Sequence, residues 1–504
     1  MTAELRAPAE VQHPDRFFAD GIWIEPSTNA VFDVVDPATE ELYYRAASAQ
    51  PADMDRVVGS ARQAFDHGPW PRMSHAERAE YLVALGEGLI RRARDLSRIW
   101  SSESGAVYSL SAQYCGFFGE IYKYYAGLAG DFPFVERHRP TAGGSVGLLV
   151  REPVGVVGAI VPWNSAMGLI AYKTAPALLA GCTVVVKSPP EAPGSAYVFA
   201  EVAEEAGVPP GVINIVTADR EVSELLVRDP RVDKITFTGS TAVGRRIGAL
   251  CAERVARCNL ELGGKSAALI LDDFDLGTAA NALSASARVL AGQNCSNLSR
   301  IIVSRHRHDE FVEALSESFA KTEVGDPYAA STEMGPLSIR RQRDRVEGYI
   351  AKGIEQGAML ATGGGRPEQL DRGYYIEPTV FADVDNGSVI AQEEIFGPVL
   401  SVIPADSEDH AIELANDTIY GLNSAVFTDD PDRALRCARR VRAGTVGHNA
   451  YRQDFGIAFG GFKQSGIGRE GAREGLFPFL ETKTVVLDAE PSALRMMNIR
   501  QVSQ

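Results

Sequence analysis

The amino-acid sequence predicts an α/β protein with two domains, each built around a mostly parallel sheet. Three observations lead to this fold class. The 504 residues are more than one hydrophobic core normally serves. Short β-branched segments alternate with amphipathic helical segments, and this alternation occurs twice, before and after Gly264. Repeated strand, helix and strand segments favour right-handed crossovers and a parallel sheet covered by helices on both faces.

The first alternation begins after residue 150. Expected strands occupy residues 154–161, 183–186, 212–216 and 234–237. A helix is expected over residues 195–206, because Val198, Phe199 and Val202 share one face. Gly207 follows this segment directly, which is typical of a helix end. The pattern predicts a doubly wound first domain.

The second alternation follows Gly264. Expected strands occupy residues 267–271 and 301–303, and expected helices occupy residues 276–290 and 309–319. This is enough for a second α/β domain.

Composition excludes several classes of partner. The net charge is −16 and there is no basic stripe, which argues against nucleic acid and anionic membrane. Pro162 and Lys187 interrupt the most apolar regions, so no window approaches the roughly 18 to 20 apolar residues of a membrane span. Residues 1–18 lack the apolar core of a signal peptide, so a cytoplasmic protein is expected. The six cysteines include no C-x-x-C pair, which predicts reduced thiols.

Glycine-rich stretches offer three candidate turns. Residues 466–471 match G-x-G-x-x-G, but polar residues precede them instead of a buried strand, so we reject them as a dinucleotide site. Residues 143–147 match the hydrolase elbow, yet an apolar strand follows where a helix is required, so we expect a hairpin turn. Residues 239–244, GSTAVG, follow the strand KITFT and precede a helical pattern, which suits a phosphate at a helix N-terminus. An ordinary capped helix explains this stretch equally well when it stands alone.

One cysteine, Cys295, lies between small and polar residues in AGQNCSN. A free cysteine is commonly a small buried hydrophobe, so the residue alone does not indicate a nucleophile. PWN at 162–164 and ELGGK at 261–265 precede it, and with them the chain resembles the aldehyde dehydrogenase superfamily over nearly its whole length. The other motifs that carry the resemblance are KSPPE at 187–191, FTGSTAVG at 237–244, GQNC at 292–295, EEIFGPV at 393–399 and FGGFKQSGIGRE at 459–470.

The resemblance implies an aldehyde dehydrogenase-like fold with a Rossmann-type cofactor domain, a second α/β catalytic domain and a small β oligomerisation arm. The expected boundaries are 1–130 and 151–262 for the cofactor domain, 263–465 for the catalytic domain, and 131–150 and 478–504 for the oligomerisation arm and tail. Strands at 147–150 and 482–487 are expected to be exposed edges unless a neighbouring subunit pairs with them. A homodimer or homotetramer is therefore expected.

The resemblance also implies NAD(P)-dependent oxidation of an aldehyde to a carboxylic acid. A thiolate at Cys295 would attack the carbonyl to give a thiohemiacetal, and the Asn164 amide with the Cys295 N–H would stabilise the oxyanion. After hydride transfer to the nicotinamide, a water activated by Glu261 would hydrolyse the thioester. Lys173 and Glu470 match positions proposed to move protons or organise the site. The structural alternatives are a turn cap for Asn164, and ion pairs for the three charged residues.

NAD is the cofactor that the resemblance implies, with NADP possible. Lys187 matches the lysine of the adenosine ribose, and Glu394 matches the glutamate of the nicotinamide ribose. Many members place a carboxylate three residues after that lysine, whereas Pro190 stands there in this chain and Glu191 follows it. The residues expected to contact the cofactor are Pro162, Trp163, Lys187, Gly239, Ser240, Thr241, Gly244, Leu262, Glu394 and Phe396.

A wide, apolar substrate tunnel is expected. Small residues follow PWN where bulky ones are common, and three aromatic residues would form a wall. These features favour a medium or large apolar aldehyde, terpenoid or aromatic, although core packing selects the same residues. The residues expected to line the substrate site are Ser165, Gly168, Tyr172, Asn294, Ser296, Phe455 and Phe459.

Three alternative functions were weighed. A semialdehyde dehydrogenase that passes its acyl group to coenzyme A generally lacks the glutamate of ELGGK, which is present here. A non-catalytic structural or binding relative is disfavoured because Cys295, Asn164 and Glu261 are all retained. A thiol hydrolase would need a histidine near the cysteine, and the sequence offers no convincing one. No metal site is expected, and residues 306–308, HRH, are interpreted as a polar surface loop.

Overall fold

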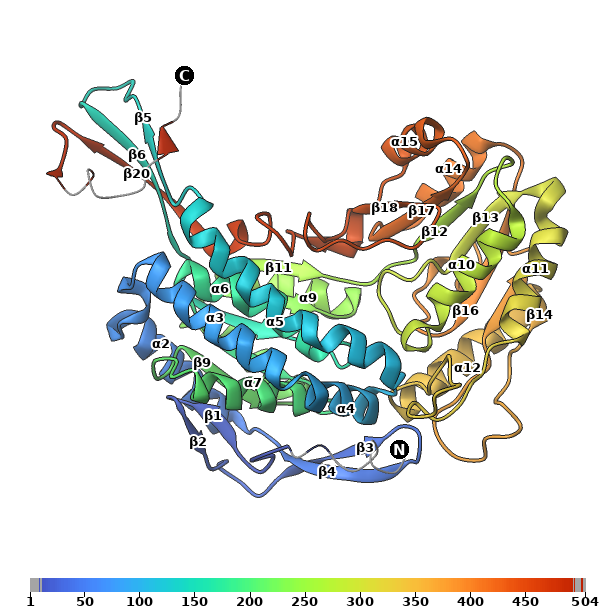
Figure 1. Cartoon of the computed structure of the whole chain (residues 1–504), viewed down its shortest axis with the longest axis horizontal. Coiled ribbons are helices and arrows are strands. Elements are labelled where there is room, and N and C mark those ends of the chain that lie inside the picture. Colours follow the sequence, from blue (N-terminus) through green and yellow to red (C-terminus); the bar gives the residue numbers. More distant parts are fainter. Residues whose placement is uncertain (1–8, 10, 493, 495–499, 502–504) are drawn as a thin grey trace.

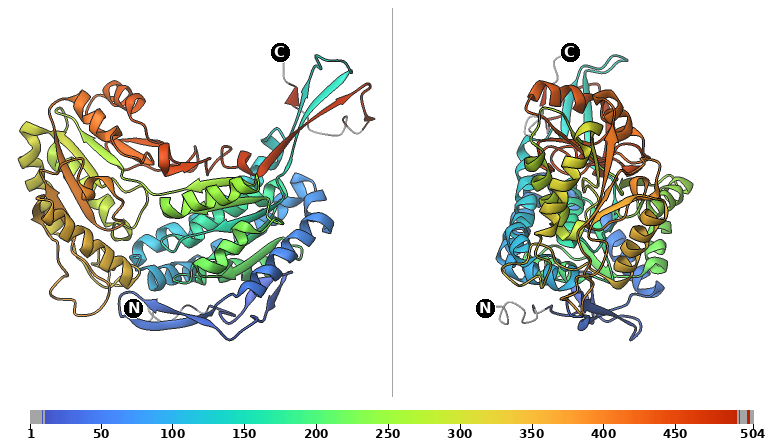
Figure 2. Two further views of the ribbon diagram at one scale, coloured as in Figure 1. Left: turned by 180° about the vertical axis from the view of Figure 1, so that it is seen from behind. Right: turned by 90° about the vertical axis from the view of Figure 1, so that its right-hand side faces the viewer.

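The structure is a computed structural model that describes residue 9, residues 11–492, residue 494 and residues 500–501. Parts of the two predicted segments at the chain ends therefore lie outside the described residues. Figure 1 shows two bodies side by side, each with its own sheet, and a β arm that projects from the first body. Figure 2 shows the same arrangement from behind and from the side.

One large sheet organises the first body. Its strands are β1 (Phe17–Ala19), β2 (Ile22–Ile24), β7 (Val156–Ile160), β8 (Thr183–Ser188), β9 (Ile213–Thr217), β10 (Lys234–Thr238), β11 (Arg257–Glu261) and β19 (Gly466–Ile467). Within the described residues their order is β19-β11-β10-β7-β8-β9-β1-β2, and the central strands β11 to β9 run parallel. The four predicted strands of the first alternation are confirmed. The strand order reverses between β7 and β10, which is where open α/β sheets bind ligands.

The edges of this sheet differ from the prediction of a parallel sheet. Strands β1, β2 and β19 pair antiparallel at the two edges. Because β19 follows the predicted catalytic domain, a late segment of the chain returns to the sheet of the first body.

Helices cover both faces of the first sheet. One face carries α3 (His75–Arg91), α4 (Ala93–Ser104), α5 (Tyr108–Asp131), α6 (Ala166–Ala180) and α7 (Gly194–Glu205), and the other carries α2 (Pro51–His67), α8 (Arg220–Arg228) and α9 (Thr241–Glu253). Val157 and Ala159 of β7 pack on the first face, whereas Val156 and Ile160 pack on the second. This alternation is that of a strand buried on both sides. Helix α7 confirms the helix predicted at 195–206.

The second body has its own mostly parallel sheet. Its strands are β12 (Ala267–Ile270), β13 (Arg300–Ser304), β14 (Met359–Thr362), β15 (Thr379–Ala382), β16 (Val399–Ala405), β17 (Asn423–Phe427) and β18 (Thr445–His448), in the order β14-β15-β16-β13-β12-β17-β18 among the described residues. Helices α10 (Leu276–Arg288) and α11 (His308–Ala320) cover one face, and α12 (Arg340–Glu355), α13 (Val389–Gln392), α14 (Glu408–Asn416) and α15 (Pro431–Arg440) cover the other. The second predicted alternation is confirmed.

The arm is a small sheet made by the chain itself. It contains β5 (Val135–His138), β6 (Val146–Pro153), β20 (Leu480–Leu487) and β21 (Arg500–Gln501), in the order β20-β6-β5-β21. The predicted hairpin turn at 143–147 is confirmed between β5 and β6. The prediction of two unpaired edges was wrong, because β20 pairs antiparallel with β6 and places Thr484 opposite Leu149. Among the described residues, the edges of this small sheet are the outer sides of β20 and β21.

The remaining elements are short. They are the hairpin of β3 (Val31–Asp36) and β4 (Glu41–Ala47), and the 3-10 turns η1 (Trp70–Arg72), η2 (Val289–Gly292), η3 (Arg305–Arg307), η4 (Lys463–Ser465) and η5 (Phe477–Phe479). Among the described helices, none has the length and apolar character needed to cross a bilayer.

Candidate active site

The PWN loop lies where the strand order of the first sheet reverses. Trp163 and Asn164 follow β7, and the turn that begins near Ser240 follows β10, so parallel strands bring both motifs to one edge. Helix α4 fastens the loop, because Ser104 Oγ donates to the Trp163 carbonyl at 2.7 Å and Trp100 Nε1 donates to the Asn164 carbonyl at 2.7 Å. The loop is therefore held by its backbone, which leaves both side chains to the site.

Cys295 lies in the loop between η2 and β13, and the backbone before it is strained. Leu290 and Ala291 have φ of 52° and 51°, a left-handed conformation that costs a non-glycine residue about 1 to 2 kcal/mol. Gly292 continues this conformation, and a Cβ there would lie 2.2 Å from the Gly397 carbonyl oxygen. Such strain is held only where the surroundings enforce it, and it concentrates at functional sites.

Two predicted motifs contact this loop. Asn164 Nδ2 donates to the Gln293 carbonyl at 3.0 Å, so the amide expected to hold the oxyanion lies against the nucleophile loop and does not cap a turn. A Cβ on Gly264 would lie 2.3 Å from the Cys295 carbonyl oxygen, so the ELGGK backbone packs on the same loop. The Gln293 side chain braces it further by accepting the Ser338 N–H at 3.0 Å.

The resting sulfur of Cys295 is a neutral thiol. Burial raises the pKa of this thiol to about 12, and the charges of Glu394 and Glu261 act in the same direction. The backbone N–H groups of Cys295 and Ser296 point at the sulfur and oppose the shift of its pKa. These surroundings favour the thiol over the thiolate, so a proton must leave sulfur when attack begins.

Glu261 ends β11 as a buried carboxylate. Neither of its oxygens has a hydrogen-bond partner within the described residues, so the alternative of a surface ion pair is excluded. Gly460 makes room for it, because a Cβ there would lie 2.8 Å from Glu261 Oε1. Burial raises the pKa of Glu261 well above its usual range, Glu470 raises it further, and Lys173 and Arg469 oppose the shift. A buried carboxylate with a raised pKa and free oxygens is a candidate general base.

Lys173 and Glu470 form a buried ion pair close to Glu261. Lys173 Nζ donates to Glu470 Oε1 at 2.5 Å, and the two side chains are 0% and 3% exposed. Lys173 Nζ also donates to Thr236 Oγ1 at 3.4 Å. Removing one partner from a buried pair typically costs about 3 to 5 kcal/mol. Lys173 and Glu470 therefore form an ion pair, as the structural alternative for these residues expected. The pair lies beside Glu261, the candidate base.

The turn after β10 has the geometry of an anion site. Ser240 caps α9, its Oγ accepting a backbone N–H of the first turn at 3.4 Å. Gly244 serves packing, because a Cβ there would lie 2.3 Å from Leu262 Cδ2. The Thr241 hydroxyl is hydrogen-bonded to the phenol of Tyr420, which comes from the second body. The helix N-terminus therefore fits a pyrophosphate, whereas Gly244 and Leu262 act by holding α9 against β11.

Glu394 lies over the glycines of ELGGK. Its Oε1 accepts the Gly264 N–H at 3.2 Å, and a Cβ on Gly263 would lie 2.4 Å from its Oε2. Burial raises the pKa of Glu394 to about 7. Phe396, with φ of 62°, meets Trp163 edge to face at 5.5 Å between ring centroids. Glu394 and Phe396, which the family pattern places at the nicotinamide ribose, line one small pocket together with Gly264 and Lys265.

Lys187 lies at the carboxyl end of β8. Burial lowers the pKa of Lys187 to about 8, and the charges of Glu191 and Asp219 oppose this shift. Glu191 forms an ion pair with Arg341 of α12. A carboxylate therefore lies near Lys187 although Pro190 occupies the position where one was expected.

The three aromatic residues predicted to form a wall of the substrate site are stacked on one another. Tyr172 and Phe455 stack at 3.8 Å between ring centroids with 16° between ring planes, and Phe455 stacks on Phe459 at 4.6 Å with 26°.

The expected widening of the tunnel at Gly168 was wrong. A Cβ on Gly168 would lie 2.9 Å from Phe118 Cε1 and 3.2 Å from Ser165 Oγ. The ring of Phe118, on α5, therefore fills the space that the missing side chain leaves.

Asn294 and Ser296 flank the nucleophile, but their side chains are already engaged. Both bond to the hydroxyl of Tyr451, and Ser296 is fully buried. The analysis by motif missed Tyr451 and Gln453, because nothing in their spacing relates them to Cys295.

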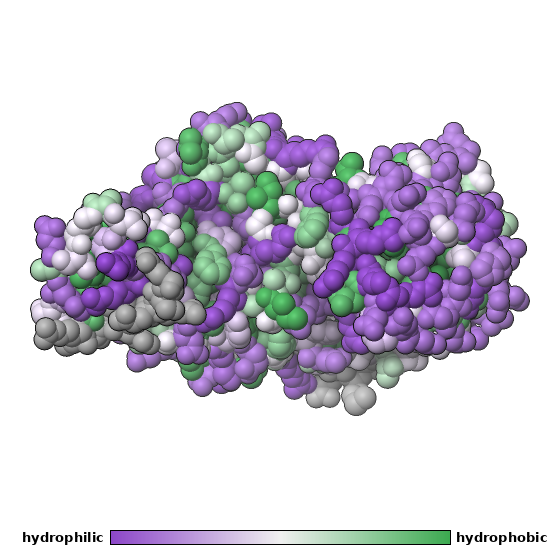
Figure 3. Space-filling model, turned by 90° about the horizontal axis from the view of Figure 1, so that it is seen from above, coloured by the Kyte–Doolittle hydropathy of each residue, from purple (hydrophilic) through white to green (hydrophobic). Residues whose placement is uncertain are grey.

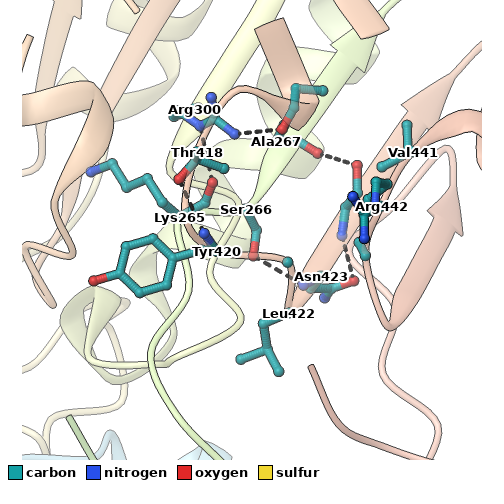
Figure 4. A pocket seen from close by; sticks show the side chains of 14 residues that line it. Lys265, Ser266, Ala267, Arg300, Thr418, Tyr420, Leu422, Asn423, Val441 and Arg442 are labelled. Carbon is teal, nitrogen blue, oxygen red and sulfur yellow. Dashed lines mark hydrogen bonds between the residues drawn. The ribbon is translucent and has the colours of Figure 1, made fainter. Parts of the chain in front are cut away.

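The sequence analysis also missed Lys265 of ELGGK as a site residue. Arg300 Nε donates to the Lys265 carbonyl at 3.0 Å, and Figure 4 shows the Lys265 and Tyr420 side chains extending to the same side, away from Arg442. Burial lowers the pKa of Lys265 to about 7, while Glu394 opposes the shift. Its Nζ has no hydrogen-bond partner in the part of the chain that the structure describes. The sequence signal that could have identified Lys265 is its place in the ELGGK motif.

The interpretation of residues 306–308 as a surface loop was only half correct. The His306 side chain is 70% exposed, but that of His308 is 6% exposed, and its Nε2 accepts the Asp383 N–H at 3.0 Å. His308 is buried because it begins α11, which packs on the sheet. No cluster of three or more His, Cys, Asp or Glu residues suited to a metal occurs among the described residues.

The face above the site carries exposed apolar side chains. Figure 3 shows hydrophobic residues gathered in the middle of the face seen from above, between the arm and the second body. Ile457, Ile467 and Phe477 of the late chain segment are 73%, 58% and 43% exposed. Exposed apolar patches of this kind mark interaction surfaces.

Comparison with known proteins identifies a family. The model of the "Aldehyde dehydrogenase family" matches residues 23–485. A geranial dehydrogenase of Castellaniella defragrans is 43% identical over 471 residues, covering 93% of this chain and 98% of that protein. A 3-succinoylsemialdehyde-pyridine dehydrogenase of a Pseudomonas species is 40% identical, with 93% and 98% covered.

Solved structures agree with these relatives. An aldehyde dehydrogenase of Mycobacterium tuberculosis complexed with NAD⁺ superposes with a TM-score of 0.91 at 45% identity, covering 94% of this chain and 98% of that one. A mutant of aldehyde dehydrogenase C from Pseudomonas syringae, complexed with NAD⁺ and octanal, gives a TM-score of 0.91 at 37% identity, with 96% and 99% covered.

Proposed function

This chain belongs to the aldehyde dehydrogenase family, and on that premise we propose that it oxidises an apolar aldehyde to the carboxylic acid with NAD through an acyl adduct on Cys295. The observation that carries the proposal is the convergence of three groups on one loop. Asn164 and Gly264 contact the loop of Cys295, and the unpaired carboxylate of Glu261 lies near enough to raise the pKa of the thiol.

Each residue then has a defined role in the reaction. The Cys295 sulfur adds to the aldehyde carbonyl as its proton passes to solvent water, and the oxyanion accepts hydrogen bonds from Asn164 Nδ2 and the Cys295 N–H. NAD supplies the hydride acceptor when it is bound. Glu261 takes a proton from the water that attacks the resulting thioester, and the carboxylic acid leaves sulfur. The Lys173 and Glu470 pair sets the charge around that base.

The cleft residues fit the cofactor. The N-terminus of α9 with Ser240 and Thr241 would hold the pyrophosphate, and Lys187 would donate to the adenosine ribose. Glu394, with a pKa raised to about 7, would accept from the nicotinamide ribose. Trp163 and Phe396 would bound the ring. These assignments rest on the match to the family motifs and on the free N–H groups at the start of α9.

The retained carboxylate also separates this proposal from acyl transfer to coenzyme A. A glutamate held at Glu261 with free oxygens serves hydrolysis, because a water needs a base there whereas a thiol acceptor does not. A purely structural role is disfavoured, since strain before Cys295 and buried unpaired carboxylate oxygens at Glu261 both cost stability.

The substrate preference is tested with a panel of aldehydes. Because the stacked rings of Tyr172, Phe455 and Phe459 are apolar, terpenoid, aromatic and medium-chain aliphatic aldehydes are expected to show a higher kcat/KM than a charged quaternary ammonium aldehyde. The names of the relatives that act on geranial or hold octanal support this choice. The rate with each aldehyde is followed by the absorbance of the reduced nicotinamide, once with NAD and once with NADP. A preference for the charged aldehyde would contradict the proposal.

Glu191 is expected to favour NAD over NADP. Its negative charge near Lys187 would repel a 2′-phosphate, so Glu191→Gln should raise the ratio of kcat/KM for NADP to that for NAD by about fivefold, the effect of a partly exposed charge. Arg341→Ala removes its ion-pair partner and should lower the same ratio. Equal ratios in both variants and the unaltered protein would remove Glu191 and Arg341 from cofactor selection.

We also propose a cytoplasmic homo-oligomer, either dimer or tetramer. The six cysteines are all free thiols in the structure, in keeping with a reducing compartment. The outer edge of β20 and the apolar residues Ile457, Ile467 and Phe477 are surfaces that a second copy would cover. Light scattering on the purified protein measures the mass, and a monomer at micromolar concentration would contradict the proposal.

A further inference from the structure

One phenol ties together the two side chains that flank Cys295. Asn294 Nδ2 donates to Tyr451 Oη at 2.8 Å, and the hydroxyls of Ser296 and Tyr451 are 2.7 Å apart. Tyr451 Oη in turn donates to Gln453 Oε1 at 3.1 Å, and Gln453 Nε2 donates to Ser296 Oγ at 3.4 Å. The four side chains form a closed network around the backbone of the nucleophile, and neither the family motifs nor the mechanism above uses it.

The network determines which end of the Asn294 amide faces the sulfur. The Ser296 backbone N–H, which can only donate, points at Asn294 Oδ1 at 3.3 Å, and Ser296 Oγ donates to the same oxygen at 3.0 Å. The amide nitrogen is therefore the atom that reaches Tyr451. Cys295 Sγ lies 3.9 Å from Asn294 Oδ1, and its S–H group donates a hydrogen bond to that oxygen. An acceptor in this position favours the neutral thiol, whereas the NH₂ group would favour the thiolate.

Tyr451 is anchored independently of the loop that it contacts. The preceding Asn449, with φ of 56°, accepts the Thr428 N–H and donates to the Thr428 carbonyl, both at 2.9 Å. The Arg452 carbonyl accepts from Asn423 Nδ2 at 3.1 Å. The phenol is thus held by the ends of β17 and β18, so it can brace the Cys295 loop from outside.

We propose that Tyr451 is a positioning residue for the nucleophile, holding the Asn294 amide with its oxygen toward the Cys295 thiol so that the resting sulfur keeps its proton and its direction. The proposal takes from the proposed function only the role of Cys295. The other titratable groups that act on this thiol are Glu394, over the ELGGK glycines, and Glu261, at the end of β11. Neither of these carboxylates belongs to the network, so a change at Tyr451 tests the amide alone.

Tyr451→Phe is the direct test, because it removes one hydroxyl and keeps the ring. The Asn294 amide loses the acceptor of its NH₂ group, so that Ser296 alone holds its oxygen toward sulfur and the amide turns over more often. Alkylation of Cys295 by iodoacetamide, without aldehyde or cofactor, is expected to become about two- to tenfold faster at neutral pH, the effect of one hydrogen bond. The pH profile of alkylation should move to lower pH. Peptide mass spectrometry assigns the reaction to Cys295. In turnover, kcat should fall while the Kd for NAD stays unchanged.

Two further variants keep the test decisive. Ser296→Ala removes a second hydrogen bond to Asn294 Oδ1 and should move the alkylation profile in the same direction. Tyr328→Phe removes a buried phenol hydroxyl that is bonded to Ser102, outside the network, and should leave the profile unchanged. Thermal unfolding confirms that each variant is folded. Profiles of Tyr451→Phe and Ser296→Ala that superpose on that of the unaltered protein would overturn the inference. A shifted profile in a protein that oxidises no aldehyde would support it while refuting the proposed function.

Discussion

Cys295→Ala is expected to lower aldehyde oxidation by at least about a thousandfold, because no other group can form the acyl adduct on which the reaction depends. The sulfur is placed by its own strained loop, with Asn164 and Gly264 packed against the same backbone. Alanine keeps the backbone N–H of the oxyanion site but offers no nucleophile. Turnover followed by absorbance of the reduced nicotinamide measures the loss.

The affinity for NAD should survive the same substitution. The groups expected to hold the cofactor lie on β8, on the start of α9 and on the loop after α13, and none of them depends on the Cys295 side chain. Quenching of tryptophan fluorescence on addition of NAD measures this, since Trp163 lies in the cleft beside Phe396. Cys258→Ala is the matched control, because this half-buried thiol lies beside Cys251 on the opposite side of the sheet from Lys173. Substantial turnover in Cys295→Ala would refute the covalent route.

The sequence predicted those parts of the fold that depend on local pattern. Strands β7 to β10 of the first sheet and β12 and β13 of the second were expected from apolar runs, and helix α7 was expected from its apolar face and the stop at Gly207. Strands β1, β2 and β19 were missed, because segments of two or three residues become strands only when a neighbouring strand offers hydrogen bonds. The pairing of β6 with β20 in the arm was also missed, because the two strands are more than 300 residues apart in the sequence.

In the candidate site too, features marked by local motifs were predicted, whereas contacts between distant residues were not. The motifs singled out Cys295, Asn164 and Glu261, and the structure brings Asn164 to the loop of Cys295. Asn164 and Glu261 lie at the carboxyl ends of the parallel strands β7 and β11, which meet at one edge of the sheet. Contacts between distant side chains were not predictable from the sequence. Phe118 fills the space at Gly168, and Tyr451 takes up the polar groups of Asn294 and Ser296. Even the charge of the nucleophile depended on burial, which a motif does not encode.

Glu261→Gln is expected to leave a burst of reduced cofactor and to slow the steady state by about a hundredfold or more. Formation of the acyl adduct needs Cys295 and the oxyanion donors, whereas its hydrolysis needs a base for water. Glutamine keeps the shape of the side chain and removes that base. Rapid mixing with excess aldehyde should show about one equivalent of reduced cofactor per site, followed by slow turnover. An unchanged steady rate would remove Glu261 from this role, and Glu253→Gln, on the surface end of α9, serves as the control.

The pH dependence of the steady-state rate tests whether Glu261 is the base. A general base works in its ionised form, so hydrolysis should rise with pH through the pKa of Glu261, and burial together with Glu470 places that pKa well above the usual range of a carboxyl. Glu470→Gln removes the like charge and leaves the Lys173 ammonium facing Glu261 without its partner. Both changes lower the pKa of Glu261. The acid limb of kcat should therefore move to lower pH in Glu470→Gln, and a limb that stays in place or moves to higher pH would show that another group is the base.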